Sequence, residues 1–236
     1  MNFSNFKNKT VLITGHTGFK GLWLSIILLS LGSKIIGISL KPNSYQKKVL
    51  KKISSKKIKN YFFDICDRLK LKKVLIKNKP DYVFHLAAQP IVSESYKSPL
   101  MTWKTNVMGT GNLLDVLRFL KKKCAVIIVT SDKCYEINSQ KKITFLKETD
   151  RLGGNDPYSA SKASAEIIFK SYYHSYLKKK KNISITSVRA GNIIGGGDWS
   201  KNRIIPDCAK HWVKKKKLHI RNPNHVRPWQ HVLDGI

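Results

Sequence analysis

Residues 10–21, TVLITGHTGFKG, decide the fold of this chain. The apolar run at 10–14 predicts a short buried strand, and the apolar stretch at 21–31 predicts the helix that follows it. The turn between them carries glycines at 15, 18 and 21. Such a turn lets the backbone approach a diphosphate, which the amide groups at the helix N-terminus can then bind. We therefore expect a dinucleotide-binding turn rather than a purely structural one.

The rest of the chain alternates short apolar runs with helical stretches. Strands are expected at 34–40, 61–63, 82–88, 125–130 and 183–188, and helices at 67–78, 103–120 and 157 to about 177. The lysine-rich stretch 41–60 is expected to form a surface helix or loop. Alternation of this kind predicts an α/β fold with a doubly wound parallel sheet of the Rossmann type.

The pattern changes after Arg189, where the chain becomes richer in Gly, Pro and Trp. We place a domain boundary at this change. Residues 1–190 are expected to form the dinucleotide-binding Rossmann domain, and residues 191–236 the start of a smaller substrate domain.

The formal net charge of +31 comes mostly from lysine, since only seven of the 45 Lys and Arg residues are arginines. Proteins dedicated to nucleic acids use arginine for bidentate and stacking contacts. Because no basic motif interleaved with aromatic residues is visible, we expect no nucleic-acid partner. The lysine excess is typical of an AT-rich genome. The alternative is an electrostatic role toward anionic substrates, a membrane surface or RNA.

The four cysteines, at 66, 124, 134 and 208, have neither the spacing of zinc ligands nor that of a disulfide framework. The first ten residues lack an apolar signal core, and the longest apolar run is far shorter than the roughly 20 residues of a membrane span. We expect no metal, no membrane insertion and a location in the reducing cytoplasm.

A second motif, YSASK at 158–162, places Tyr158 and Lys162 one turn apart on the same face of a helix. A lysine ammonium beside a phenol lowers the pKa of the phenol, so Tyr158 is expected to act as a base near neutral pH. The pair follows the glycine turn and a fifth strand that ends in Thr130-Ser131. We therefore interpret it as catalytic.

Together with HLAAQ at 85–89 and TSDK at 130–133, these motifs resemble the extended short-chain dehydrogenase/reductases of the NAD-dependent epimerase/dehydratase family, which act on nucleotide sugars. GHTGFKG at 15–21, RAGN at 189–192, GGGDW at 195–199 and RPWQH at 227–231 narrow the resemblance to the CDP-glucose 4,6-dehydratases. The resemblance covers essentially the whole chain. It implies a lyase that converts CDP-glucose to CDP-4-dehydro-6-deoxyglucose and water in deoxysugar and O-antigen lipopolysaccharide biosynthesis.

In the implied reaction, Tyr158 takes the proton of the sugar 4-hydroxyl while a hydride leaves C4 for NAD and later returns to C6. Ser131 hydrogen-bonds the 4-oxygen. Asp132 is the implied acid for water loss, since burial can raise the pKa of a carboxyl group. Lys133 is either the base for the C5 proton or a cation that stabilises the enolate. A loop salt bridge between Asp132 and Lys133 is the structural alternative.

The resemblance also assigns the binding residues. The expected cofactor-binding residues are Gly15, His16, Thr17, Gly18, Phe19, Gly21, Asp64, Ile65, Leu86, Ala87, Ala88, Thr130, Tyr158 and Lys162, and the expected substrate-binding residues are Ser93, Asn192, Arg203 and Arg227. An ordinary turn or surface role is the alternative for Asp64 and for the substrate residues. Residues 39–41 lack the acid that would hold the adenosine ribose, which leaves NADP open. We choose NAD because the family's reaction cycle keeps its cofactor bound.

The chain ends soon after RPWQH, whereas family members continue for on the order of 100 residues. We expect a fragment or a truncated gene product that is poorly soluble or inactive, and a homo-oligomer for the full-length protein. Two alternatives stay open: another nucleotide-sugar dehydratase or epimerase, and a non-catalytic basic protein that binds dinucleotides or RNA.

Overall fold

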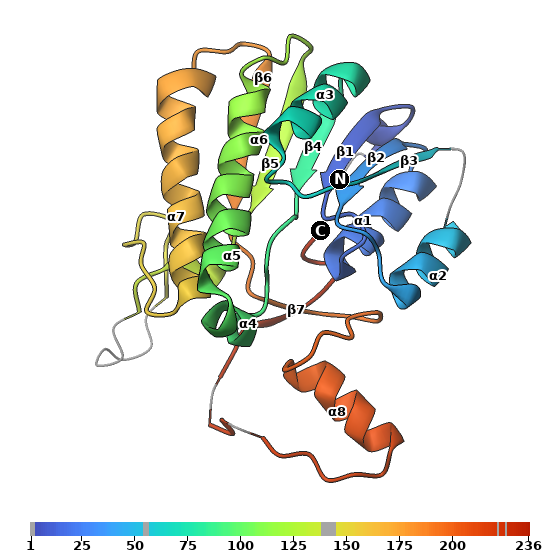
Figure 1. Cartoon of the computed structure of the whole chain (residues 1–236), viewed down its shortest axis with the longest axis vertical. Coiled ribbons are helices and arrows are strands. Elements are labelled where there is room, and N and C mark those ends of the chain that lie inside the picture. The colour runs from blue at the N-terminus through green and yellow to red at the C-terminus, as the bar shows by residue number, and fades with distance from the viewer. Residues whose placement is uncertain (1–2, 54–56, 138–144, 221, 225) are drawn as a thin grey trace.

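The computed structural model describes residues 3–53, 57–137, 145–220, 222–224 and 226–236. In these residues, six parallel strands form one sheet in the order β3-β2-β1-β4-β5-β6, as Figure 1 shows. The strands are β1 (Thr10–Thr14), β2 (Lys34–Ser39), β3 (Ile58–Phe62), β4 (Tyr82–His85), β5 (Cys124–Val129) and β6 (Ile183–Val188). The chain builds outward from β1 to β3, returns to the centre, and builds outward again from β4 to β6. Sheets of this kind bind ligands at the switch point, beyond the carboxyl ends of the strands.

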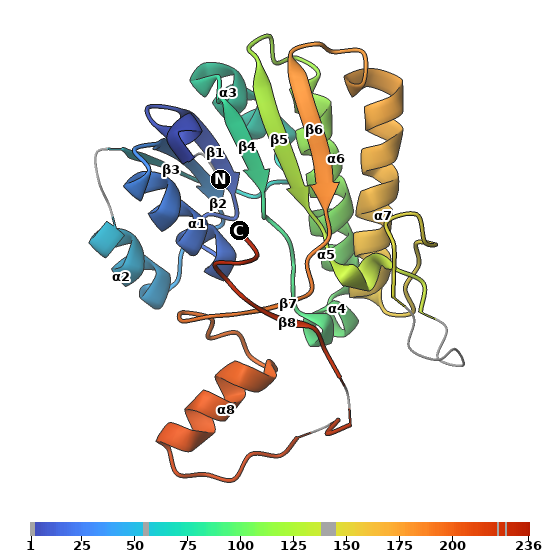
Figure 2. The same ribbon diagram turned by 180° about the vertical axis from the view of Figure 1, so that it is seen from behind.

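Helices lie on both faces of the sheet. They are α1 (Phe19–Ser30), α2 (Ser44–Ile53), α3 (Arg68–Asn78), α4 (Val92–Lys97), α5 (Pro99–Trp103), α6 (Gly109–Leu117), α7 (Pro157–Tyr172) and α8 (Ile204–Val213). Figure 1 shows α3, α6 and α7 on the near face, and Figure 2 shows α1 on the opposite face. This arrangement confirms the fold class predicted from the sequence.

Alternate residues of β1 supply two separate hydrophobic cores. Leu12 packs into the cluster that β4 and β5 share with α3, α6 and α7. Val11 and Ile13 face the other side and pack against Leu24 and Leu28 of α1. Burial on both faces explains why the strand is a continuous apolar run rather than an alternating one.

β1 and β6 match their predicted bounds, β2 and β5 differ from theirs by one residue at one or both ends, and β3 and β4 differ by more. β3 begins at Ile58 instead of 61, because an edge strand can pair with β2 while Lys59 and Asn60 stay exposed. β4 ends at His85 instead of 88, because Ala87 turns back to donate its amide hydrogen to Thr14 Oγ1 at 3.2 Å. The residues released from β4 become part of the cleft described below.

The helix predicted over 103–120 is interrupted. A π-helical turn, Lys104–Met108, separates α5 from α6. The turn places Asn106 in the interior, where it is 1% exposed. Its side-chain amide donates to the Gln89 carbonyl at 3.2 Å and to Ser161 Oγ at 2.9 Å. The widened turn therefore joins α6 to the β4 exit and to α7, which a uniform helical pattern does not reveal.

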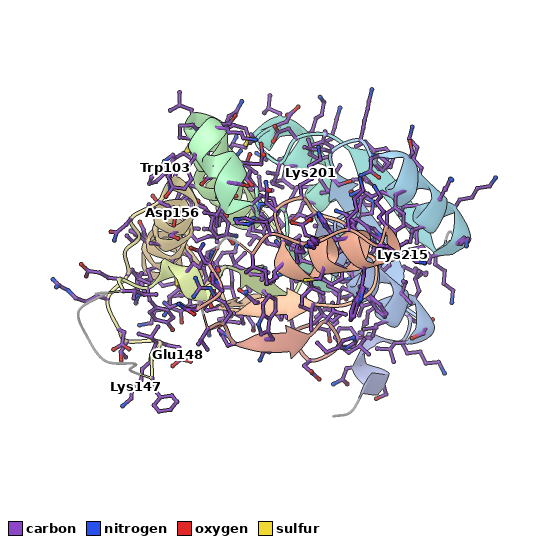
Figure 3. The ribbon with its side chains drawn as sticks, turned by 90° about the horizontal axis from the view of Figure 1, so that it is seen from below. Trp103, Lys147, Glu148, Asp156, Lys201 and Lys215 are labelled. Atoms are coloured by element: carbon purple, nitrogen blue, oxygen red, sulfur yellow. The ribbon has the colours of Figure 1, made fainter. Side chains whose placement is uncertain are left out.

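The segment after β6 passes below the carboxyl ends of the strands. Its short strand β7 (Asn192–Ile194) pairs in parallel with β8 (Trp229–His231). Figure 3, which views the molecule from this side, shows α8 and the β7–β8 pair in front of the sheet, with Asp156 at the start of α7. None of the helices in the described part of the chain has the length and hydrophobicity needed to cross a membrane.

Candidate active site

The glycine turn packs too closely for any side chain at two of its positions. Gly15 has a φ of 75°, and a Cβ there would lie 2.8 Å from the amide nitrogen of Ala87. A Cβ on Gly21 would lie 2.2 Å from the carbonyl oxygen of Gly15. Helix α1 starts after Gly18, which supplies no side-chain cap, and its first turn holds no acid. The free amides at this helix start fit the diphosphate of a dinucleotide.

The turn opens into a cleft of about 1320 Å³ at the switch point between β1 and β4. The residues that line it come from the ends of β1 to β5, from the start of α7 and from the segment between β6 and α8. All but two of the predicted site residues line this cleft: Gly15, Thr17, Gly18, Phe19, Gly21, Asp64, Ile65, Leu86, Ala87, Ala88, Ser93, Thr130, Ser131, Asp132, Lys133, Tyr158, Asn192, Arg203 and Arg227. His16 and Lys162 lie behind it.

His16 is a packed interior residue. It is 1% exposed, and its Nε2 lies 2.8 Å from Asn60 Oδ1 on β3. A Cβ on Gly37 would lie 2.3 Å from the imidazole ring, so β2 carries a glycine where the ring passes. Burial lowers the pKa of His16 and keeps the ring neutral. Its side chain therefore lies between the glycine turn and the sheet, while its chain neighbours Gly15 and Thr17 line the cleft.

Tyr158 stands on the first turn of α7, which Asp156 caps by accepting hydrogen bonds from the amides of Tyr158 and Ser159. Tyr158 is 8% exposed, and both it and Ser131, at the end of β5, line the cleft. Burial raises the pKa of Tyr158, although the Ser131 hydroxyl acts against this shift. The sequence argument predicted a lowered pKa. That direction is wrong for this structure because the argument counted the neighbouring charge and left out burial.

Lys162 lies one turn further along α7 and is 6% exposed. Its Nζ donates to the carbonyl oxygen of Val129 at 3.5 Å. Burial and, after it, the positive charge of Lys20 lower the pKa of Lys162 to about 8, against the opposing effects of Cys134 and Glu166. The amine therefore gains and loses its proton close to neutral pH, beneath the floor of the cleft.

Asp132 and Lys133 form a short 3-10 turn directly after β5. Ser131 Oγ donates to Asp132 Oδ1 at 3.1 Å and accepts from the Lys133 amide at 3.3 Å. Lys133 Nζ lies 5.9 Å from the centre of the Tyr158 ring. Within the described residues, no ion pair joins Asp132 to Lys133, so the salt bridge considered above does not form. Burial lowers the pKa of Lys133, and the charge of Arg227 adds to this effect.

The residues after β6 form a further part of the cleft wall, and Trp23 of α1 donates its ring N–H to the Gly196 carbonyl at 2.8 Å. Arg203 Nη1 lies 3.5 Å from Asp198 Oδ2, in the GGGDW segment. Asn202 donates its side-chain amide to Ser93 Oγ at 3.0 Å and so joins this segment to the start of α4. Arg227 reaches the same cleft from the chain just before β8. Two arginines therefore line the same cavity as Ser131 and Tyr158.

Two charged residues near the site, Lys20 and Glu166, were not among the site residues predicted from the sequence. Lys20, inside the glycine motif, lines the cleft. Glu166, one turn after Lys162, is 1% exposed and accepts from Thr130 Oγ1, Ser187 Oγ and Arg189. The signal for Lys20 was a cation in the first turn of a helix, and the signal for Glu166 was its four-residue spacing from Lys162. In the described residues, no group of three or more His, Cys, Asp or Glu side chains is arranged to hold a metal.

A parallel sheet in this order, with a glycine turn at its switch point and Ser131, Tyr158 and Lys162 around the cleft, defines a short-chain dehydrogenase/reductase. The chain belongs to the GDP-mannose 4,6-dehydratase family, whose family model matches residues 12–236. Its curated relatives include the CDP-glucose 4,6-dehydratase of Salmonella typhimurium, which is 40% identical over 98% of this chain and 65% of the relative.

Solved structures share the fold of this chain. The UDP-N-acetylglucosamine 4-epimerase of Methanobrevibacter ruminantium, in complex with UDP-N-acetylmuramic acid, has a TM-score of 0.81 and 26% identity over 96% of this chain and 70% of its own. The UDP-glucuronic acid 4-epimerase of Bacillus cereus, in complex with UDP-glucuronic acid and NAD, has a TM-score of 0.81 and 22% identity over the same shares. The chain spans about two thirds of the length of such relatives, 65% for the Salmonella enzyme.

Proposed function

We propose that this chain carries the catalytic machinery of a CDP-glucose 4,6-dehydratase, a lyase that converts CDP-glucose to CDP-4-dehydro-6-deoxyglucose and water. The observation that carries the proposal is the adjacent pair Asp132-Lys133, on the cleft wall beside Ser131 and Tyr158. Oxidation at one carbon needs only the Ser–Tyr–Lys set, whereas loss of water needs a further acid and base. The 40% identity to the Salmonella enzyme supports CDP-glucose as the substrate.

NAD is the proposed cofactor. The uncapped start of α1 and the two closely packed glycines fit its diphosphate, and Asp64, Ile65 and residues 86–88 line the adjoining part of the cleft. Ser39 donates its hydroxyl to the Leu40 carbonyl at 2.9 Å, so β2 ends without a carboxylate for the ribose. The NAD-bound epimerase of Bacillus cereus supports NAD over NADP. When bound, the nicotinamide accepts a hydride from the sugar and returns it.

The first proton transfer falls to Tyr158. Ser131, which lines the cleft with Tyr158 and acts on its pKa, is proposed to hold the sugar 4-oxygen at the same time. Because burial raises the pKa of Tyr158, the phenolate needs a nearby cation to form near neutral pH. Lys162, one turn below and with a pKa of about 8, is the proposed source of that charge.

The residues after β5 are proposed to catalyse the loss of water. Once the sugar carries a carbonyl at C4, its C5 proton is acidic, and Lys133 is the proposed base because burial and Arg227 favour its neutral amine. Asp132 is the proposed acid that gives a proton to the departing 6-hydroxyl. Its carboxylate accepts from Ser131, which links this step to the oxygen that Tyr158 serves.

The remaining assignments follow the layout of the cleft. Asn192, Arg203 and Arg227 are proposed to bind the substrate diphosphate, since guanidinium groups suit phosphate oxygens, and Ser93 to face the sugar. We propose residues 1–190 as the dinucleotide-binding domain and 191–236 as the first part of the substrate domain. A cytoplasmic location and a homo-oligomeric full-length protein are part of the same proposal.

The test is to incubate the purified chain separately with CDP-glucose, dTDP-glucose, UDP-glucose and GDP-mannose. An inactive fragment, as the sequence led us to expect, would leave all four sugars unchanged, whereas the proposed activity should let mass spectrometry detect the loss of one water from CDP-glucose, with faster turnover than for the other three sugars. Extraction of the protein should release NAD. An unchanged mass with inversion at C4 would instead identify an epimerase, and extraction of NADP would refute the cofactor assignment.

A further inference from the structure

Lys20 carries its charge in an unfavourable place. It is the second residue of α1, and the positive end of a helix dipole repels cations there. The side chain is half-buried and lines the cleft. Among the described residues, its ammonium group makes neither a hydrogen bond nor an ion pair within 4 Å.

The charged neighbours of Lys20 point to a ligand rather than to a protein partner. The positive charge of Arg203 lowers the pKa of Lys20, and the positive charge of Lys20 in turn lowers the pKa of Lys162. Asp132 is the carboxylate that attracts Lys20. Burial and the charge of Arg203 together lower the pKa of Lys20. An anion bound beside Lys20 would favour its protonated form and offset the repulsion from Arg203.

Lys20 differs in its ion pairing from two arginines near the same site. Arg189 is paired with Glu166 at 3.1 Å, and Arg203 lies 3.5 Å from Asp198. Each of these guanidinium groups has a carboxylate of its own, whereas Lys20 faces open cleft. The cavity of about 1320 Å³ has room for a ligand that touches both the glycine turn and the GGGDW segment.

We propose that Lys20 is a further ligand-binding residue of this cleft and that its ammonium contacts a diphosphate oxygen next to Arg203. The diphosphate can come from the nucleotide sugar or from the dinucleotide, and the inference rests on the proposed function for the identity of these two ligands. Lys20 then links the glycine turn to the substrate side of the cleft. Anion binding there also removes a repulsion from Lys162.

Calorimetric titration of the purified chain with CDP and, separately, with NAD tests the proposal. The variants are Lys20→Met, which removes the charge, and Lys20→Arg, which keeps it. Lys170→Met removes a charge from the exposed side of α7 and serves as the control. We expect Lys20→Met to weaken one of the two ligands at least tenfold, with Lys20→Arg restoring most of the affinity and Lys170→Met within twofold of the wild type.

The titrations with CDP and with NAD together identify which ligand supplies the diphosphate. Weaker CDP binding with unchanged NAD binding assigns Lys20 to the nucleotide sugar, and the reverse result assigns it to the dinucleotide. Equal affinities in wild type and Lys20→Met, or a wild type that binds neither ligand, would overturn the proposal. Lys20-dependent binding without turnover of CDP-glucose would refute the proposed function and leave the role of Lys20 standing.

Discussion

The carboxylate of Glu166 on α7 lies 3.1 Å from the guanidinium of Arg189 at the exit of β6, with side-chain exposures of 1% and 10%. The same carboxylate accepts hydrogen bonds from Thr130 and Ser187, and the guanidinium lies 4.7 Å from the centre of the Tyr135 ring. This ion pair lowers the pKa of Glu166 and raises that of Arg189. It joins the carboxyl ends of β5 and β6 to the helix that carries Tyr158.

Breaking this pair should destabilise the chain strongly. Removal of one partner leaves the other charge buried without compensation, which costs about 3 kcal/mol or more. We expect Glu166→Gln to lower the free energy of unfolding by that amount in urea denaturation. The double variant Glu166→Gln/Arg189→Met should lose less than the sum of the two single variants, because neither charge is then left alone.

The exposed pair Lys97–Glu94 is a matched control, with side-chain exposures of 68% and 44%. Lys97→Met should change the free energy of unfolding by less than about 0.5 kcal/mol. Equal losses for Lys97→Met and Glu166→Gln would show that burial does not govern the strength of these pairs.

His85 should make the chain sensitive to acid. Its ring is 2% exposed, with Nδ1 at 2.8 Å from Thr14 Oγ1 and Nε2 at 3.1 Å from Thr110 Oγ1. Burial lowers the pKa of His85 from 6.5 to about 3. Between these values the unfolded chain binds a proton that the folded chain does not, so stability falls as the pH drops from 6.5 to 3. The largest slope is about 1.4 kcal/mol per pH unit.

The measurement is the free energy of unfolding at several pH values in this window. His85→Gln should be less stable at pH 7, because the bridge between Thr14 and Thr110 is disturbed, yet its stability should decline less steeply toward acid. Parallel curves for the two proteins would mean that His85 is not the group responsible.

Much of the fold could be predicted because the decisive information is local. The apolar run of β1 and the glycine spacing after it specify a strand, a turn and a helix within a dozen residues. The spacing of Tyr158 and Lys162 likewise follows from helix geometry alone. Predictions of this kind depend on neighbours in sequence, which the chain displays directly.

The rest depends on contacts between distant segments. Burial of His16 against Gly37 and Asn60 is decided by how β2 and β3 pass the glycine turn. The π-helical turn around Asn106 exists because Gln89 and Ser161 bind its side chain. No local pattern encodes such partners, and for the same reason the direction of the Tyr158 pKa shift could not be foreseen.

Gly21 should tolerate no substitution. A Cβ at this position would lie 2.2 Å from the Gly15 carbonyl oxygen, a backbone atom that can move only with the turn. We expect Gly21→Ala to displace the start of α1, lower the free energy of unfolding by about 2 kcal/mol or more and weaken NAD binding. Gly196 is the control, since a Cβ there has no atom within 4 Å among the described residues. If Gly196→Ala weakens NAD binding as much as Gly21→Ala does, close packing at the turn is not the cause.

Lys162 should show a conflict between stability and activity. Its pKa of about 8, against an ordinary value of 10.5, means that the protonated folded state carries a penalty of about 3 kcal/mol below pH 8. This penalty fades as the pH rises from 8 to 10.5, so Lys162 contributes less instability at high pH. We expect Lys162→Met to be more stable than the wild type at pH 7 and to lose that advantage above pH 10. Turnover should fall at least a hundredfold, and lower stability at pH 7 would contradict the argument.

Asp132 and Lys133 should affect different steps of the reaction. If Lys133 is the base for C5, Lys133→Met should slow the exchange of the C5 proton of CDP-4-dehydro-6-deoxyglucose in heavy water by a factor of about 100 or more. Asp132→Asn leaves the Lys133 amine in its position near Tyr158, but it removes the acid that gives a proton to the departing hydroxyl. This variant should exchange the C5 proton within about tenfold of the wild-type rate while losing net dehydration of CDP-glucose. Nuclear magnetic resonance follows the exchange, and mass spectrometry follows the water loss. Intact exchange in Lys133→Met would refute the base assignment and leave its ammonium as a stabiliser of the enolate.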